Sequence, residues 1–271
     1  MQRALVNGIE VAFDLRGTGE PIVMIHGAQG DQSMFNDIAA LFTRDFRVLT
    51  FDQRGSGLSE KPDMDYSIAL FADDTAALMD HVGFSKAHIV GVSMGGMIAQ
   101  EFALRHPHKV SSLVLGCTTP GGPKAHRIGG PAFTAAYSAK AMSAEDRGRA
   151  LAEAAFTKGY IDRHPEIVPA MIEARRQRPI DPVALDHRLK AALNHDTYDR
   201  LSQINCPTLV ITGREDALIA WENSEILAHH IPGANLVVLE PAGHCFWLEQ
   251  PQQSAEALLN FIRSNSPGAN Q

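Results

Sequence analysis

The sequence predicts an α/β fold, a mostly parallel sheet with helices on both faces and an inserted helical segment, and two observations carry this prediction. Short apolar runs rich in strand-forming residues alternate with longer stretches whose apolar residues recur at helical spacing, which is typical of a parallel sheet covered by helices. Between about Thr119 and Arg200 the alternation stops, and helical patterns follow one another without a strand. We therefore expect a core domain, residues 1–118 and 201–271, with a helical cap, residues 119–200, inserted into it.

The elements of the first half follow from the period of their apolar residues and from the position of proline. Runs of β-branched and aromatic residues predict strands, whereas apolar residues three and four positions apart predict helices. The helix that begins at Met94 ends before Pro107, because a proline disfavours helical geometry in the residue before it. The expected strands are 11–14, 22–25, 46–51, 87–90 and 112–116, and the expected helices are 67–82 and 94–105.

The same reasoning gives the elements of the second half. Ser143 is a helix N-cap in the expected cap, since it is followed by the acidic residues that favour a first turn. Pro165 and Pro182 stand where the first turn of a helix accepts proline. After the cap we expect a strand over 207–212, a helix over 221–230, a strand over 235–239 and a helix over 251–264.

Composition and charge exclude several classes of partner. The chain has 271 residues, of which 45% are hydrophobic, and its formal charge of −7 comes without a long run of basic residues, so we expect neither nucleic acid nor anionic membranes as partners. No stretch approaches the roughly 20 apolar residues of a membrane span, and the first residues are too polar for a signal peptide. A cytoplasmic location is expected. The 3 cysteines, without a C-x-x-C pair, predict neither disulfides nor a zinc site.

A G-x-S-x-G motif, Gly91-Val-Ser-Met-Gly95, directly follows a predicted strand and opens a predicted helix. This is the context of a nucleophile elbow, in which a serine sits on a sharp, strained turn and small neighbours keep the chain from clashing. The motif alone would fit a glycine-rich turn with an incidental serine equally well. Its placement between strand and helix favours Ser93 as a nucleophile.

Two further polar sites follow the predicted strands near the end of the chain. His244 comes shortly after the last strand and is the candidate base that would take the serine proton. In the turn after the preceding strand, either Glu215 or Asp216 could orient this histidine. Because ligands bind at the carboxyl ends of parallel strands, these side chains are expected to lie near Ser93.

Acyl transfer also needs hydrogen-bond donors for the oxygen that becomes negative in the tetrahedral intermediate. The backbone N–H of Met94, at the start of the helix after Ser93, is one candidate donor. The loop after the strand 22–25 supplies the second, for which we choose the N–H of Ala28. His26 is expected to shape this loop and not to act as the base.

The run Asp52-Gln-Arg-Gly-Ser-Gly contains two glycines and could suggest a phosphate-binding loop. It lacks the G-K-[ST] of such a loop and opens no helix, so a structural turn is the better interpretation. We expect Asp52 and Arg54 to form a buried network there.

Together these motifs resemble the α/β-hydrolase superfamily, in the branch that contains 3-oxoadipate enol-lactonases, carboxylesterases and hydrolases of carbon–carbon bonds. The order serine, acid, histidine along the chain is that of this superfamily. The resemblance implies an eight-stranded, mostly parallel sheet whose second strand is antiparallel, a cap after the sixth strand, no cofactor and no metal, and it favours Asp216 over Glu215 as the acid. The matching segments are His26-Gly27, Asp52-x-Arg-Gly-x-Gly-x-Ser59, Gly91 to Gly96, Gly213-Arg-Glu-Asp216 and Gly243-His244.

The expected activity is hydrolysis of small, partly apolar carboxylic esters or lactones by Ser93, His244 and Asp216 through an acyl-enzyme. Two alternatives stay open. One is a non-hydrolytic or carbon–carbon-bond-cleaving enzyme of the same fold, such as a perhydrolase or lyase, and the other is a small-molecule receptor. The only partner required is the substrate, and a homodimer is compatible with the sequence. The residues expected to contact the substrate are Gln29, Phe133, Tyr137, Trp221, Phe246 and Trp247.

Overall fold

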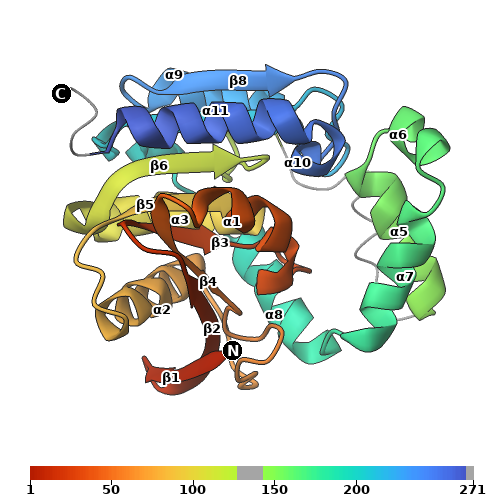
Figure 1. Ribbon diagram of the computed structural model, residues 1–271, viewed down its shortest axis with the longest axis horizontal. Coiled ribbons are helices and arrows are strands. Elements are labelled where there is room, and N and C mark those ends of the chain that lie inside the picture. Colours follow the sequence, from red (N-terminus) through yellow and green to blue (C-terminus); the bar gives the residue numbers. More distant parts are fainter. Residues whose placement is uncertain (127–142, 267–271) are drawn as a thin grey trace.

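The computed structural model describes residues 1–126 and 143–266. Within these residues eight strands form one sheet in the order β1-β2-β4-β3-β5-β6-β7-β8 (Figure 1). β2 runs antiparallel to its neighbours β1 and β4, and every other neighbouring pair is parallel. This arrangement confirms the predicted sheet and its antiparallel second strand. The strands are β1 (Gln2–Val6), β2 (Ile9–Arg16), β3 (Glu20–Ile25), β4 (Phe46–Phe51), β5 (Ala87–Val92), β6 (Val110–Gly116), β7 (Thr208–Gly213) and β8 (Asn235–Leu239).

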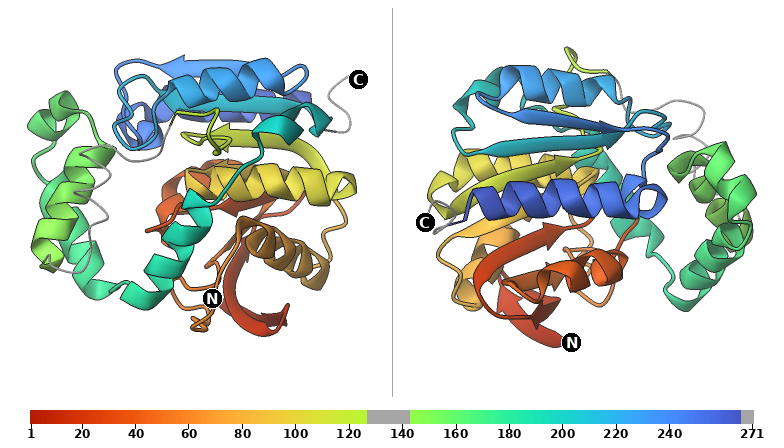
Figure 2. Two further views of the ribbon diagram at one scale, coloured as in Figure 1. Left: turned by 180° about the vertical axis from the view of Figure 1, so that it is seen from behind. Right: turned by 45° about the horizontal axis from the view of Figure 1, so that its top comes forward.

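Helices cover both faces of the sheet, with α2, α3 and α9 on one face and α1 and α11 on the other (Figure 2). Each face has its own apolar cluster, one containing Phe71 and Phe102 and the other containing Phe42 and Ile262. Every residue of the central strand β5 is therefore buried. The helices are α1 (Asn36–Phe42), α2 (Ile68–His81), α3 (Met94–Arg105), α9 (Glu222–His230), α10 (Phe246–Glu249) and α11 (Pro251–Ser264), with 3-10 turns η1 (Gln32–Phe35), η2 (Pro107–Lys109) and η3 (Tyr198–Gln203).

Between β6 and β7, the described residues form a run of helices that Figure 1 shows as an arc beside the carboxyl ends of β6 and β8. Ser143 caps the first of them by accepting a hydrogen bond from the N–H of Asp146, and Pro182 opens the last, as the sequence predicts. We propose that residues 119–200 form a cap on a core of residues 1–118 and 201–271. No helix in the described part of the chain combines the length and hydropathy that a membrane span requires. The helices of this run are α5 (Ala144–Ala155), α6 (Lys158–Arg163), α7 (Ile167–Gln177) and α8 (Pro182–Leu193).

The N-terminal hairpin differs from the sequence expectation, which contains no strand before residue 11. β1 pairs with β2 through a two-residue turn at Asn7 and Gly8, whose φ angles are 47° and 78°. Asn-Gly is favoured in such turns because both central residues need positive φ. β1 buries only Ala4 and Val6, so its apolar pattern is too short to identify a strand.

The expected pairing of Asp52 with Arg54 is wrong, although both side chains are buried. Arg54 donates through Nε and Nη2 to the two carboxylate oxygens of Asp74 on α2, at 2.8 Å each. The Asp52 carboxylate instead accepts the backbone N–H groups of Gln32 and Leu58, also at 2.8 Å. Since backbone donors already satisfy Asp52, Arg54 pairs with the buried carboxylate of Asp74.

Candidate active site

Ser93 lies on the turn between β5 and α3, with φ 56° and ψ −123°. This left-handed φ is costly for a residue with a side chain and persists only where the surrounding chain enforces it. Two glycines allow the turn: a Cβ on Gly91 would lie 2.2 Å from the Gly95 carbonyl oxygen, and one on Gly95 would lie 2.0 Å from that of Ile25. The G-x-S-x-G spacing therefore meets a steric requirement.

Hydrogen bonds on one side and close packing on the other hold the strained serine. The Ser93 N–H donates to the carbonyl of Gly116 at 2.9 Å, and Thr118 Oγ1 donates to the Ser93 carbonyl at 2.7 Å. On the other side, a Cβ built on Gly27 would lie 3.1 Å from the Ser93 Cβ and 3.5 Å from its Oγ. The loop after β3 thus passes directly against the candidate nucleophile.

His244 and Asp216 form a buried pair at the carboxyl ends of β8 and β7. His244 Nδ1 lies 2.7 Å from Asp216 Oδ2, and the Asp216 side chain has 0% exposure. Asp216 Oδ1 accepts the N–H groups of Leu218 and Ile219 at 2.9 Å each, which fixes the carboxylate. Glu215, the other carboxylate that the sequence left open, is exposed. The geometry supports Asp216 as the partner of this histidine.

Backbone hydrogen bonds join the two loops that carry this pair. Arg214 N–H donates to the Leu239 carbonyl at 3.0 Å, and Glu215 N–H donates to the Ala242 carbonyl at 2.9 Å. A Cβ on Gly213 would lie 2.2 Å from the carbonyl oxygen of Gly243, so only glycine allows this approach. The glycine before the acid is needed to bring the histidine within reach.

The charge of Asp216 controls the proton affinity of His244. Burial by itself lowers the pKa of the imidazole, but the negative charge of Asp216 and its hydrogen bond raise the pKa well above the ordinary 6.5. Cys117, which follows β6 and has a φ of 40°, also raises the pKa of His244. The pair therefore stabilises the imidazolium that a general base becomes.

Cys117, Asp216 and His244 also offer ligand atoms within 4.8 Å of one another, and these are ligand types that zinc accepts. However, Asp216 Oδ2 and His244 Nδ1 hydrogen-bond to each other at 2.7 Å. We therefore propose that the group serves proton transfer. The expectation that the site works without a metal or cofactor stays a prediction.

The two candidate oxyanion donors flank Ser93. Met94 is the first residue of α3, where the backbone N–H groups of the first turn have no partner within the helix. Ala28 follows Gly27 in the loop that touches the serine, and its side chain is buried. Their use as donors stays a prediction.

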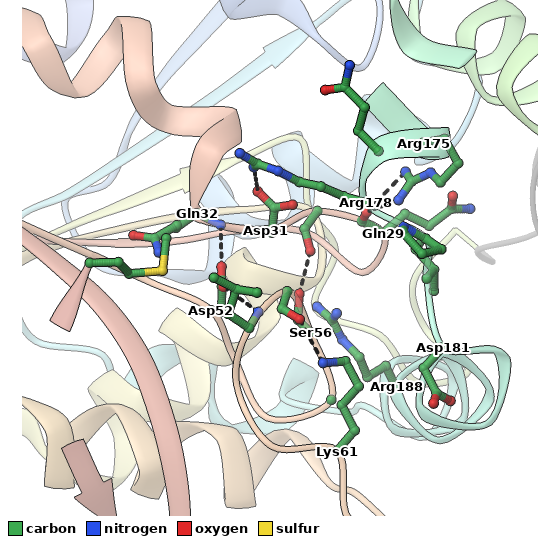
Figure 3. Close-up of a pocket in the computed structure, with 18 residues that line it drawn as sticks. Gln29, Asp31, Gln32, Asp52, Ser56, Lys61, Arg175, Arg178, Asp181 and Arg188 are labelled. Atoms are coloured by element: carbon green, nitrogen blue, oxygen red, sulfur yellow. Dashed lines mark hydrogen bonds and ion pairs between the residues drawn. The ribbon is translucent and has the colours of Figure 1, made fainter. Parts of the chain in front are cut away.

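The residues expected to contact substrate lie in different surroundings. Gln29 lines a cavity of about 490 Å³ beside the cap helices α7 and α8 (Figure 3). Phe246 and Trp247 are buried in the apolar cluster under α1 and α11. The Trp221 ring stacks on the Arg214 guanidinium, with 3.7 Å between Cζ and the ring centroid. The expected contacts at Phe133 and Tyr137 lie outside the described residues.

The cap helices contact the loop that carries the histidine. The Cys245 N–H donates to the carbonyl of Ala155 at the end of α5, at 2.9 Å. Glu249 accepts the N–H of Gly243 at 2.8 Å and the hydroxyl of Thr157 at 2.6 Å. One carboxylate thus joins the histidine loop to the start of α6.

A family model for the alpha/beta hydrolase fold matches residues 20–251 of the chain. The chain belongs to the alpha/beta hydrolase family. A 3-oxoadipate enol-lactonase of Acinetobacter baylyi is 31% identical over 225 residues, covering 81% of this chain and 80% of the relative. A Pseudomonas savastanoi protein, named provisionally as the carbamate hydrolase RutD, is 30% identical over 262 residues and covers 91% and 95%.

The crystal structure of the enol-lactonase from Burkholderia xenovorans superposes with a TM-score of 0.86 at 27% identity, and the match covers 96% of this chain and 99% of the other. These names support hydrolase activity for this chain.

Sequence patterns did not identify several residues around the candidate site of this alpha/beta hydrolase. Cys117 and Thr118 directly follow β6, so the rule that selected the other site residues, a polar residue after a strand, could have found them. Gln53 and Arg188 also lie at the loop after β3, but they come from distant segments. Spacing along the chain contains no signal for such contacts.

Proposed function

We propose that this hydrolase cleaves carboxylic esters or lactones through a Ser93, His244 and Asp216 triad and an acyl-enzyme. The observation that carries the proposal is the strained Ser93, held between the loop after β3 and the carboxyl end of β6 while a buried histidine–carboxylate pair occupies the neighbouring strand ends. A serine elbow with a base already oriented by an acid has the parts that acyl transfer needs.

In the proposed mechanism Ser93 Oγ attacks the substrate carbonyl while His244 Nε2 takes the hydroxyl proton. Nδ1 keeps its proton in the 2.7 Å hydrogen bond to Asp216, whose charge stabilises the imidazolium. The N–H groups of Ala28 and Met94 bind the oxyanion. The tetrahedral intermediate then expels the alkoxide, which receives the proton from His244, and leaves an acyl-serine.

Water completes the cycle by the same route. His244 takes a proton from a water molecule that attacks the acyl-serine, and the second tetrahedral intermediate returns Ser93 to its hydroxyl form as the acid departs. In a lactone both products remain one hydroxy acid, or its keto form when an enol-lactone is opened. The same triad therefore serves esters and lactones.

The identity of the substrate rests on the relatives. Similarity to two enol-lactonases supports an ester or lactone as the substrate class. Carbamate hydrolysis is the second candidate, supported by the similarity to the RutD protein, and it uses the same attack on a carbonyl. Gln29, which lines the cavity beside the cap, remains a proposed substrate contact. A homodimer and a cytoplasmic location also remain proposals.

The test of the triad is Ser93→Ala, with 4-nitrophenyl butyrate as the substrate and a fluorophosphonate as the covalent label. We expect turnover to fall by about 10³-fold or more and the label to be lost in mass spectrometry, with an unchanged circular dichroism spectrum. Ser85→Ala, at an exposed serine, is the matched control and should match the wild type. Undiminished turnover by Ser93→Ala, at the purity of the control, would overturn the proposal.

A panel of aryl esters, enol-lactones and aryl carbamates then separates the substrate classes. We expect kcat/KM for an ester or lactone to exceed that for a carbamate with the same aryl group by more than about 100-fold, because the carbamate nitrogen makes the carbonyl less electrophilic unless the pocket compensates. The reverse order would favour the second candidate.

A further inference from the structure

The Gly27 carbonyl is the acceptor of three hydrogen bonds. His26 Nδ1 lies 2.8 Å from this oxygen, the Gly30 N–H donates to it at 3.2 Å, and Arg188 Nη2 donates to it at 3.1 Å. This carbonyl belongs to the same peptide unit as the Ala28 N–H. Because a trans peptide is planar and its C=O and N–H point in opposite directions, whatever fixes the carbonyl also aims the Ala28 N–H.

The tautomer of His26 makes it a permanent donor to that carbonyl. Its Nε2 accepts the N–H of Gln53 at 3.2 Å, so the ring proton lies on Nδ1, facing Gly27. Burial, with the nearby charge of Arg188, lowers the pKa of His26 to about 3. The imidazole therefore stays neutral, and the one full positive charge among the three donors is that of Arg188.

Arg188 reaches this carbonyl from the proposed cap. It lies on α8 and is 2% exposed, and its Nη2 also donates to Gln53 Oε1 at 3.2 Å. Gln53 in turn donates through Nε2 to the His26 carbonyl at 2.5 Å. Figure 3 shows Arg188 extending from α8 into the space beside the loops that carry Ser56 and Gln29. A cap residue thus joins the hydrogen-bond network behind the loop that follows β3, residues 26–30, which we call the oxyanion loop.

We propose that Arg188 is a positioning residue, which orients and polarises the Gly27–Ala28 peptide so that the Ala28 N–H becomes an effective oxyanion donor only when α8 is seated on the core. A donor with full charge makes a hydrogen bond about twice as strong as a neutral one, and a carbonyl that accepts it makes the N–H of the same amide a stronger donor. The inference rests on the proposed function, and it makes the seating of α8 on the core a condition for catalysis.

The test compares two substitutions of Arg188 with a neighbour on the same helix. Arg188→Met keeps much of the side-chain volume but removes the donors, whereas Arg188→Lys keeps the charge. His187→Gln is the matched control, because His187 Nε2 contacts Asp63, at 2.8 Å, and not the oxyanion loop. Two quantities are measured for each: kcat and KM with 4-nitrophenyl butyrate, and the inhibition constant of an aryl trifluoromethyl ketone. This ketone adds to a serine hydroxyl and places the resulting oxyanion in the hole.

We expect Arg188→Met to lower kcat about 10- to 100-fold with KM within threefold, and to weaken the ketone by a similar factor. Arg188→Lys should recover part of both losses, and His187→Gln should stay within twofold of the wild type. An unchanged kcat and ketone affinity in Arg188→Met would overturn the proposal.

A purely structural role of Arg188 would give a different result. It would lower thermal stability equally in Arg188→Met and Arg188→Lys, without rescue by lysine and with KM and kcat both affected, and this also overturns the proposal. If Arg188→Met does not fold, the same comparison is made between Arg188→Lys and the wild type. Failure of the triad itself is recognised separately, because Ser93→Ala would then bind the ketone as tightly as the wild type.

Discussion

At the scale of single residues, the candidate site depends on residues whose conformation is fixed by the neighbouring backbone. Ser93 has its left-handed φ because the glycines around it permit the turn, and Asp216 is fixed by two N–H groups of its own loop. Such fixed groups need little reorganisation when charge develops. The residues that sequence patterns did identify are those whose chemistry requires a turn after a strand.

The raised pKa of His244 predicts a pH dependence of activity. A general base must be neutral, so with His244 as the base we expect kcat/KM to rise with pH as this residue loses its proton, and the raised pKa places the rise above pH 6.5. In Asp216→Asn the raising charge is gone while burial, which lowers the pKa, remains. We expect the rise to move to lower pH and kcat to fall by about 10⁴-fold.

The measurement is a pH profile of kcat/KM for both proteins. A profile for Asp216→Asn that rises at the same pH as the wild type would show that another group, and not His244, titrates. Binding of the trifluoromethyl ketone, followed over the same pH range, checks that the site remains assembled.

At the scale of elements, most of the sheet could be predicted because central strands of a parallel sheet are continuous apolar runs. The expected bounds lie within two residues of the observed ones, at both ends, for β3, β4, β5, β7 and β8. β1 could not be predicted, because an edge strand that buries only Ala4 and Val6 has little pattern. The Asn7-Gly8 turn was its available signal.

In the strand–turn–helix unit around Ser93, a glycine-to-alanine substitution tests whether the elbow needs glycine for steric reasons. Gly91→Ala places a Cβ 2.2 Å from the Gly95 carbonyl oxygen, so the elbow must open. We expect the free energy of unfolding to fall by about 2–3 kcal/mol and kcat to fall more than about tenfold. Urea denaturation and ester turnover measure the two effects.

The matched control is Gly83→Ala, at a glycine with φ +79° and nothing within 4 Å of the added Cβ. It costs only the strain of the left-handed backbone, about 1–2 kcal/mol, and should leave kcat unchanged. Equal kcat losses in the two variants would contradict the steric interpretation of the elbow.

At the scale of the whole molecule, buried histidines with a lowered pKa make stability depend on pH. Burial, and for each a nearby arginine, lowers the pKa of His26 and of His195 to about 3. The unfolded chain takes up protons on these residues near pH 6.5, whereas the folded chain does so only near pH 3. Between these values the unfolded state binds more protons, so the free energy of unfolding falls as the pH falls, by about 1.4 kcal/mol per pH unit for each.

His195→Gln should therefore show a shallower loss of stability between pH 6.5 and 4 than the wild type, as measured by urea denaturation. His244, with its raised pKa, acts in the opposite sense, since its contribution is present below pH 6.5 and is lost at higher pH; it is common to both proteins and cancels in the comparison. His108→Gln, at an exposed histidine, is the control and should keep the wild-type slope.

The contacts between cap and core were beyond prediction for a physical reason. Arg188 and Gly27 are separated by 161 residues, and Thr157 and Glu249 by 92. Hydrophobic period and turn chemistry describe neighbours along the chain and contain no information about which distant side chains meet. The candidate triad was predictable because a parallel sheet brings strand ends together, whereas a cap seated on loops follows no such rule.

The hydrogen bond from Arg188 to the Gly27 carbonyl has a practical consequence for chimeras built from members of this family. A cap exchanged between two hydrolases would be expected to transfer substrate preference, as a separate module would. If the donor at position 188 serves the oxyanion loop, a foreign cap without an equivalent cation would fold, admit its own substrate and still turn it over slowly. Chimeric enzymes would then be limited less by the shape of the new pocket than by one hydrogen bond to the old scaffold.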